Sequence, residues 1–137
     1  MNGYLLDTNI CIYLLKRRYD IDKRLDLIPE DMRVCISEVT LAELYYGASK
    51  SNDKKAHVKE VDIIANLFEV LPIRDCLELY GDNKTQLERE GNRIDDFDLL
   101  IGSTAVVNDL VIVTENVKHL GRIPNIALEN WITHHTK

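Results

Sequence analysis

Short apolar runs alternate along this chain with longer stretches of helical periodicity, and no other feature restricts its fold so strongly. Five runs have the length and composition of strands: residues 3–6, 33–36, 69–73, 110–114 and 126–128. Helical patterns lie between them, over residues 10–15, 20–28, 38–49, 58–68, 75–91, 99–107 and 117–119. Strands that are separated by helices need crossover connections, which place the strands parallel. The alternation therefore predicts an α/β fold with a mostly parallel sheet and helices on both faces.

Local signals sharpen several of these boundaries. Ser37 is the expected N-cap of the helix over 38–49, because a serine hydroxyl accepts a hydrogen bond from the first helical turn. Asp75 and Asp96 have the same chemistry and are expected to cap the two helices that follow them. Pro72 cannot donate a ladder hydrogen bond, which predicts an edge strand or a strand end at that point.

Length and composition limit the class of protein. The 137 residues, 45% of them hydrophobic and 29% charged, predict one globular domain over 1–137 with a polar tail at residues 134–137. No apolar run approaches the roughly 20 residues that span a bilayer, and the first residues lack the features of a signal peptide. Cys11, Cys35 and Cys76 are widely spaced in apolar surroundings, which favours reduced thiols in a cytoplasmic protein.

The net charge of −6 excludes attraction to nucleic acid over the whole surface. A local basic surface remains compatible with it. Three groups of basic residues are candidates for such a surface: Lys16, Arg17 and Arg18; Lys50, Lys54, Lys55 and Lys59; and Lys84, Arg89 and Arg93. Such groups are more often an ordinary solvated helix face than a contact with phosphate.

Three acidic residues stand where a globular core does not need them. Asp7 directly follows the first apolar strand, Glu43 lies within an apolar helical stripe, and Asp98 leads into a largely apolar helix. Each has a structural alternative: Asp7 as a helix cap, Glu43 in a capping box with Thr40, and Asp98 as a complement to the helix dipole. Taken together, three carboxylates at one end of a parallel sheet would form a Mg²⁺ or Mn²⁺ site.

Four short motifs follow one another along the chain: Leu5-Leu-Asp7-Thr-Asn9, Ser37-x-x-Thr40-x-x-Glu43-Leu-x-x-Gly47, Asp96-Phe-Asp98-Leu-Leu-Ile-Gly-Ser-Thr-Ala105 and Val113-Thr114-Glu115-Asn116. In this order they resemble the motifs of the PIN-domain ribonucleases and span nearly the whole chain. The length and the closing Asn130-Trp131 most resemble the VapC-type toxins of toxin–antitoxin pairs.

The resemblance implies a three-layer α/β/α sandwich and endonucleolytic cleavage of RNA by a water that Mg²⁺ or Mn²⁺ activates. It implies that the catalytic and metal-binding residues are Asp7, Glu43 and Asp98. Supporting positions carried over from the motifs are Thr8, Asn9, Asp96, Thr114 and Asn116. The implied partners are an RNA substrate, a second copy of the chain and a small antitoxin protein whose C-terminal segment blocks the acidic site.

One departure from the family pattern leaves alternatives open. Many members have Asp where this chain has Asn116, which adds no charge, so one or two metal ions are both compatible with the sequence. The same loss favours a non-catalytic module that binds RNA or protein. An aspartyl-nucleophile phosphatase would need a second Asp where Asn9 stands. No histidine, His119 included, has a sequence context that indicates a general base.

Overall fold

The computed structural model describes residues 3–132, so the expected tail at 134–137 lies outside the described residues. The five strands are β1 (Gly3–Leu6), β2 (Arg33–Ser37), β3 (Glu69–Leu71), β4 (Val111–Val113) and β5 (Leu128–Glu129). The helices are α1 (Thr8–Leu15), α2 (Ile21–Asp26), α3 (Glu38–Ser49), α4 (Lys54–Leu67), α5 (Leu77–Arg89), α6 (Asp96–Val107) and α7 (Val117–Leu120), with a 3₁₀ turn, η1 (Arg74–Cys76), before α5.

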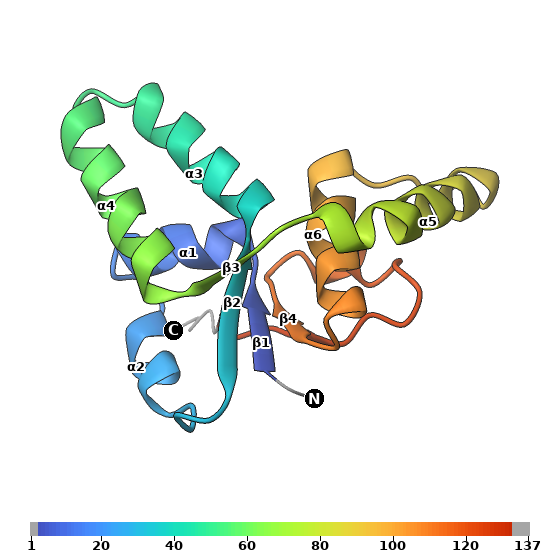
Figure 1. Cartoon of the computed structure of the whole chain (residues 1–137), viewed down its shortest axis with the longest axis horizontal. Coiled ribbons are helices and arrows are strands. Elements are labelled where there is room, and N and C mark those ends of the chain that lie inside the picture. The colour runs from blue at the N-terminus through green and yellow to red at the C-terminus, as the bar shows by residue number, and fades with distance from the viewer. Residues whose placement is uncertain (1–2, 133–137) are drawn as a thin grey trace, which may run out of the picture.

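The strands form one parallel sheet in the order β3-β2-β1-β4-β5. Helices α1 to α4 cover one face and α5 to α7 cover the other, which gives the expected α/β/α sandwich (Figure 1). Neighbouring strand residues therefore enter different cores. Leu5 packs with α5 to α7, whereas Leu6 packs with α1 to α4. None of the helices within residues 3–132 is long and apolar enough to cross a membrane.

The three cysteine thiols are free and buried, as the sequence predicted. Ser37 is the N-cap of α3, since its Oγ accepts a hydrogen bond from the backbone N–H of Val39 at 3.0 Å. Strand β3, which Pro72 follows, is an edge of the sheet. These local predictions are confirmed because each depends on chemistry that a single residue imposes on its own backbone.

The prediction that Asp75 caps a helix is wrong. Asp75 lies inside the 3₁₀ turn, and neither this turn nor α5 has a side-chain cap. The predicted cap of α6 is also one residue off. Asp95 is the cap, because its Oδ2 accepts from the backbone N–H of Phe97 at 3.2 Å, whereas Asp96 is already the first residue of the helix.

The last strand is shifted from the predicted 126–128. Asn125 has a left-handed backbone (φ 65°), and the backbone N–H of Ile126 donates back to Ile123 at 3.4 Å. The chain is therefore still turning at residue 126. Pairing with β4 begins when the carbonyl of Ala127 accepts from Ile112 at 2.9 Å. Two helices begin earlier than predicted: α1 begins at Thr8 and not at residue 10, and α4 begins at Lys54 and not at residue 58.

Candidate functional site

The candidate site lies where the chain reverses direction across the sheet. Strand β1 is in the middle, with β2 on one side and β4 on the other, so the connections after β1 and β4 leave toward opposite faces. Ligand sites of open α/β sheets lie at such points, beyond the carboxyl ends of the strands. Asp7 follows β1, and Thr114 follows β4, at this end of the sheet.

Asp7 is only 4% exposed and is held by two hydrogen bonds. Its Oδ1 accepts from the backbone N–H of Thr8 at 2.8 Å, and its Oδ2 accepts from the hydroxyl of Thr114 at 2.7 Å. Burial raises the pKa of the Asp7 carboxyl, and the two hydrogen bonds oppose that rise. Asp7 is also the N-cap of α1, so the structural alternative and the candidate site role fall on the same side chain.

Glu43 reaches this cluster from α3. Its Oε1 accepts from the hydroxyl of Thr8 at 2.7 Å. A hydroxyl has one hydrogen, so in the 3.0 Å contact between the hydroxyls of Thr8 and Thr40, Thr40 is the donor. Burial, followed by the charges of Asp7 and Asp95, raises the pKa of Glu43, while the bond from Thr8 lowers it. The apolar stripe thus holds a half-buried carboxylate aimed at the end of the sheet.

Asp98, in the first turn of α6, contacts the loop that follows β4. The side-chain amide of Asn116 donates to its Oδ2 over a long 3.4 Å, and the backbone N–H of Asn116 donates to the hydroxyl of Thr114 at 2.9 Å. Burial is the largest cause that raises the pKa of Asp98 to about 6, followed by the negative charges of Asp7, Asp95 and Glu43. One continuous hydrogen-bonded chain therefore runs from Glu43 to Asp98.

The donor set fits a hard divalent cation in kind. All three side chains offer carboxylate oxygens. The charge of Asp7 raises the pKa of both Glu43 and Asp98, and the charge of Glu43 raises the pKa of Asp98. None of the three carboxylates takes part in an ion pair within residues 3–132. They are not gathered for chelation, however: within the described part of the chain, no three Asp, Glu, His or Cys side chains lie close enough together to hold a metal ion. A cation would have to draw the carboxylates inward from their hydroxyl and amide donors.

Two of the supporting residues expected from the motifs lie outside this network. Asn9 is exposed on the first turn of α1. Asp96 faces α5 instead, where its Oδ1 accepts from the hydroxyl of Tyr80 at 3.0 Å and pairs with the ammonium of Lys84 at 3.0 Å. Lys84 and then Tyr80 lower the pKa of Asp96. The side chain of Asp96 thus joins two helices, and it is Asp95 whose charge reaches Glu43 and Asp98.

Sequence reasoning missed His119. Its Nδ1 lies 2.8 Å from the side-chain oxygen of Asn116, and so it extends the chain of contacts that ends at Asp98. The spacing between Asn116 and His119 is three residues, which is one helical turn, and that spacing was the available signal. Glu115, adjacent in sequence, turns away and accepts from the hydroxyl of Tyr13 at 2.7 Å.

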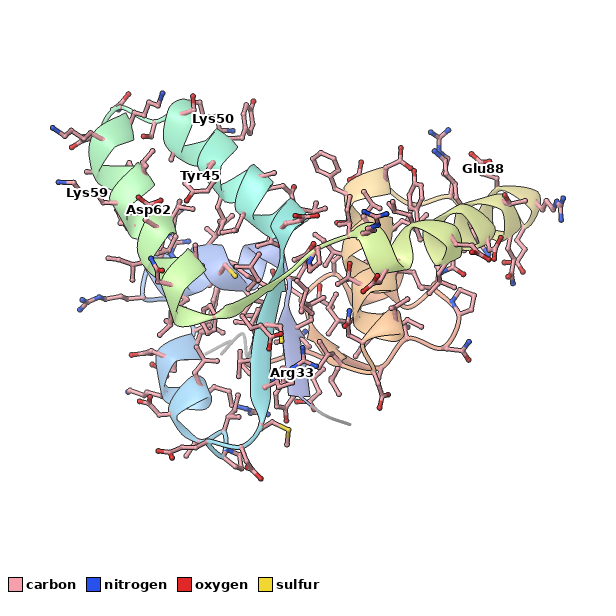
Figure 2. The ribbon with its side chains drawn as sticks, in the orientation of Figure 1. Arg33, Tyr45, Lys50, Lys59, Asp62 and Glu88 are labelled. Atoms are coloured by element: carbon pink, nitrogen blue, oxygen red, sulfur yellow. The ribbon has the colours of Figure 1, made fainter. Side chains whose placement is uncertain are left out.

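The basic residues lie in different surroundings. Lys50 and Lys59 are on the hairpin of α3 and α4, and the ammonium of Lys50 lies 4.8 Å above the ring of Tyr46 (Figure 2). Arg89 lies on α5, beside Asp82 and Glu90. Lys84 is neutralised by Asp96. Of these residues, Lys84 is therefore paired with a carboxylate, whereas Lys50 and Lys59 lie on one hairpin.

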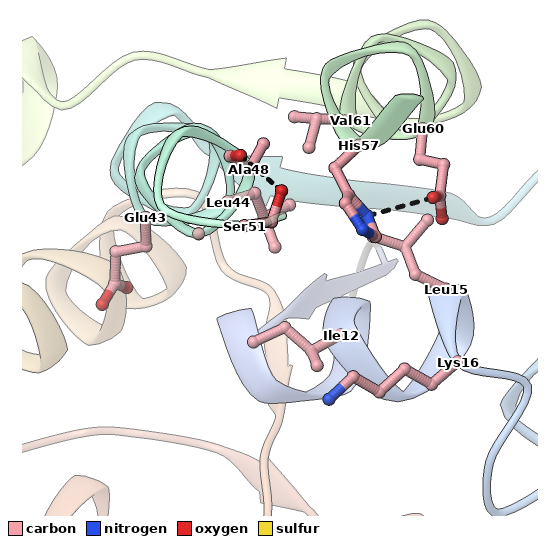
Figure 3. Close-up of a pocket in the computed structure, with 11 residues that line it drawn as sticks. Ile12, Leu15, Lys16, Glu43, Leu44, Ala48, Ser51, His57, Glu60 and Val61 are labelled. Carbon is pink, nitrogen blue, oxygen red and sulfur yellow. Dashed lines mark hydrogen bonds and ion pairs between the residues drawn. The ribbon is translucent and has the colours of Figure 1, made fainter. Parts of the chain in front are cut away.

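An apolar groove of about 340 Å³ runs between α1 and the hairpin of α3 and α4. Its walls are mainly aliphatic and include Ile12, Leu15, Leu44 and Val61. Glu43 stands at one end of this groove, and toward the other end Nδ1 of His57 lies 3.2 Å from Oε1 of Glu60 (Figure 3). The groove thus connects the hairpin to the acidic site.

Comparison with known proteins gives a consistent result. The PIN domain family matches residues 4–124 of the chain. Ribonuclease VapC2 of Rickettsia felis is 40% identical over 130 residues, which cover 93% of this chain and 97% of that protein. The tRNA(fMet)-specific endonuclease VapC of Salmonella typhimurium is 35% identical over 133 residues, which cover 96% of this chain and 99% of that protein.

Solved structures agree with the sequence relatives. VapBC2 from Rickettsia felis, bound to a DNA fragment from its promoter, superposes with a TM-score of 0.87 at 39% identity and covers 93% of this chain and 98% of that one. DNA-bound VapBC from Salmonella typhimurium gives 0.86 at 34% identity, with 96% and 99% covered. VapBC-5 from Mycobacterium tuberculosis, a member of the VapBC family of toxin–antitoxin systems, shares the fold with a TM-score of 0.70 at 23% identity, with 97% and 100% covered.

Proposed function

The chain belongs to the PIN-domain family and groups there with the VapC ribonucleases, and we propose that it is a metal-dependent endoribonuclease that acts as the toxin of a toxin–antitoxin pair. The observation that carries this proposal is the hydrogen-bonded chain from Glu43 through Thr8, Asp7, Thr114 and Asn116 to Asp98. It connects three carboxylates from three separate segments at the carboxyl end of the sheet.

Mg²⁺ or Mn²⁺ is the cofactor that we propose, and Asp7, Glu43 and Asp98 would hold it. The ion would supply an activated water and neutralise charge on the phosphodiester. Thr114 and the backbone of Thr8 fix the orientation of the buried Asp7, because they occupy one oxygen each. The hydroxyl of Thr8 ties Glu43 to the same point. Asn116 supplies a donor to Asp98, so this fourth position orients a carboxylate and adds no charge of its own.

Cleavage of RNA tests the proposal directly. The full-length protein is incubated with a mixture of tRNAs and with messenger RNA while Mg²⁺ or Mn²⁺ is titrated, and 5′ ends are mapped. We expect cleavage that EDTA abolishes and that Asp98→Asn eliminates. The matched control is Asp109→Asn, an exposed residue whose left-handed backbone (φ 53°) asparagine also accepts. Binding of RNA with no metal-dependent cleavage would support the non-catalytic module instead.

Transfer RNA is the first substrate class to test, because the Salmonella relative is named a tRNA(fMet)-specific endonuclease. The net charge of −6 supports a substrate that is recognised locally and not by attraction over the whole surface.

An antitoxin is the protein partner that we propose, and the apolar groove beside Glu43 is its proposed binding site. A helix or extended segment with aliphatic side chains would bury them against Leu15, Leu44 and Val61. A basic side chain at the end of such a segment would then reach Glu43 and compete with the metal. We propose that the protein acts in the cytoplasm and forms a homodimer, which light scattering of the purified chain would test.

A further inference from the structure

A second depression, of about 470 Å³, lies on the layer of α5 to α7 beside the acidic site. Arg93, Ile94, Asp95, Asp96 and His119 line it. Its two walls come from separate segments, the loop before α6 and helix α7. One guanidinium nitrogen of Arg122 joins these walls. It donates to the carbonyls of Asn92 (3.4 Å) and Arg93 (3.1 Å).

The proton on His119 is positioned by its neighbours. The amide NH₂ of Asn116 faces Asp98, because its nitrogen donates to Oδ2 of Asp98 at 3.4 Å. The amide oxygen of Asn116 therefore faces Nδ1 of His119 at 2.8 Å, and Nδ1 must donate. In a neutral imidazole the other nitrogen then carries a lone pair. Nε2 of His119 is thus an acceptor without a partner among residues 3–132, on an exposed side chain.

Arg93 is the group in the depression that can bind a phosphate, against the negative charges of Asp95 and Asp96. The guanidinium of Arg93 has no hydrogen-bond partner within the described residues, although its positive charge is felt by Asp96. Asp96 is already paired with Lys84 at 3.0 Å, and Asp95 accepts from the backbone at the start of α6. Of the basic residues predicted as candidates, Arg93 is therefore the one that combines a free guanidinium with a place beside the acidic site.

We propose that this depression is an RNA-specific subsite, in which Nε2 of His119 accepts a hydrogen bond from a ribose 2′-hydroxyl and Arg93 binds a neighbouring phosphate. The proposal rests on the ribonuclease activity proposed above and adds the means by which the site distinguishes RNA from DNA. A 2′-hydroxyl is the group that only RNA offers, and an acceptor that is fixed in orientation by Asn116 is complementary to it. Backbone contacts of this kind position the strand without reading its bases.

The test uses an RNA oligonucleotide with one mapped cleavage position and a series in which single nucleotides around that position are 2′-deoxy. With the wild-type protein, we expect one deoxy substitution to raise KM about tenfold, the effect of one ordinary hydrogen bond, and to leave kcat nearly unchanged. In His119→Ala the same substitution should have no further effect. Lys118→Ala, an exposed neighbour on the same helix, is the matched control and should keep the tenfold penalty.

Arg93→Gln should raise KM and should keep the tenfold rise in KM that the 2′-deoxy substitution causes, which is the deoxy penalty. It should also reduce the slope of log affinity against log salt by about 0.7, the value for one contact with single-stranded nucleic acid. Arg89→Gln, on α5, should change neither. A deoxy penalty that persists in His119→Ala, or a salt slope unchanged in Arg93→Gln, would overturn the subsite. If the wild type cleaves no RNA, the proposed function fails. Anisotropy of a labelled RNA and of the DNA of the same sequence, bound to metal-free wild type and to His119→Ala, then still tests the subsite: a preference for RNA that His119→Ala keeps would overturn it.

Discussion

The hydroxyl of Thr114 donates a 2.7 Å hydrogen bond to Oδ2 of Asp7, although the two residues lie 107 positions apart in the chain. They follow the adjacent parallel strands β4 and β1. The bond therefore links the two loops that leave the carboxyl ends of these strands at the candidate site. Thr114 is fully buried and also accepts from the backbone of Asn116. A single hydroxyl therefore sets the positions of both loops.

Thr114→Val should separate the orientation of Asp7 from packing, because valine has nearly the same shape but no hydroxyl. We expect the free energy of unfolding at pH 7 to fall by about 1.5–3 kcal/mol, the range for a lost hydrogen bond to a charged group, and RNA cleavage to fall with it. Thr114→Ser keeps the hydroxyl and should keep most of the activity. Urea unfolding and cleavage rates measure the two effects, and an active, fully stable Thr114→Val would contradict the role given to this bond.

Asp98→Asn should make the metal-free protein more stable at neutral pH. The folded state raises the pKa of Asp98 to about 6, from the ordinary 3.8, so it binds this proton more tightly than the unfolded state does. The corresponding stability is fully present below about pH 4 and is lost as pH rises through about 6. At pH 7 we expect the variant to gain about 1 kcal/mol, or roughly 3 °C in Tm, because the half-exposed carboxyl discounts the shift.

Thermal unfolding of wild type and Asp98→Asn between pH 4 and 8, in EDTA, measures this gain. The stability curves should converge toward pH 4 and separate above pH 6, whereas Asp109→Asn should follow the wild type throughout. A lower Tm for Asp98→Asn at pH 7 would contradict the destabilising effect of burying this carboxylate.

Divalent cations should reverse this order. A ligand that binds only the folded state at a hundred times its Kd adds about 2.7 kcal/mol, so Mn²⁺ should raise the Tm of the wild type by several degrees. Asp7→Asn and Asp98→Asn should lose most of that shift, and Asp109→Asn should keep it. Equal shifts in all four proteins would place metal binding elsewhere.

Gly47→Trp should block the apolar groove without disturbing the carboxylates. A Cβ added at Gly47 meets nothing within 4 Å, and this residue lines the groove one turn after Glu43 on α3. We expect cleavage of RNA to be retained and its inhibition by the cognate antitoxin to be lost. Pull-down and inhibition assays with the purified pair measure this, and unchanged inhibition would move the antitoxin to another surface.

Gly3→Ala should weaken the centre of the sheet. Gly3 has a φ of 156°, and an added Cβ would lie 2.1 Å from the carbonyl oxygen of Arg33 on β2. We expect a loss of more than about 1 kcal/mol, because backbone atoms cannot yield. Gly81→Ala, at an open position within α5, should instead stabilise by about 0.5–1 kcal/mol. Urea titration of the pair compares the two directly.

The sequence predicted the layers of the fold well, but it predicted the helix caps and the side-chain contacts between elements less well. Periodicity identifies which segments are buried, and the parallel order follows from the crossovers, so the site edge with Asp7 and Thr114 could be expected. Tertiary hydrogen bonds leave no such periodicity. Tyr80 and Lys84 draw Asp96 toward α5, which assigns the cap of α6 to Asp95. The contact of His119 with Asn116 was missed because its only signal is a spacing that every helical turn shares.

Two separately packed cores share one sheet, and the carboxylates are divided between them. Glu43 belongs to the layer of α1 to α4, whereas Asp98 belongs to the layer of α5 to α7. A small sliding of one layer relative to the other would change the separation of Glu43 and Asp98 while each core stays intact. If the carboxylates hold a cation as proposed, its affinity would therefore depend on how the two layers are positioned relative to each other.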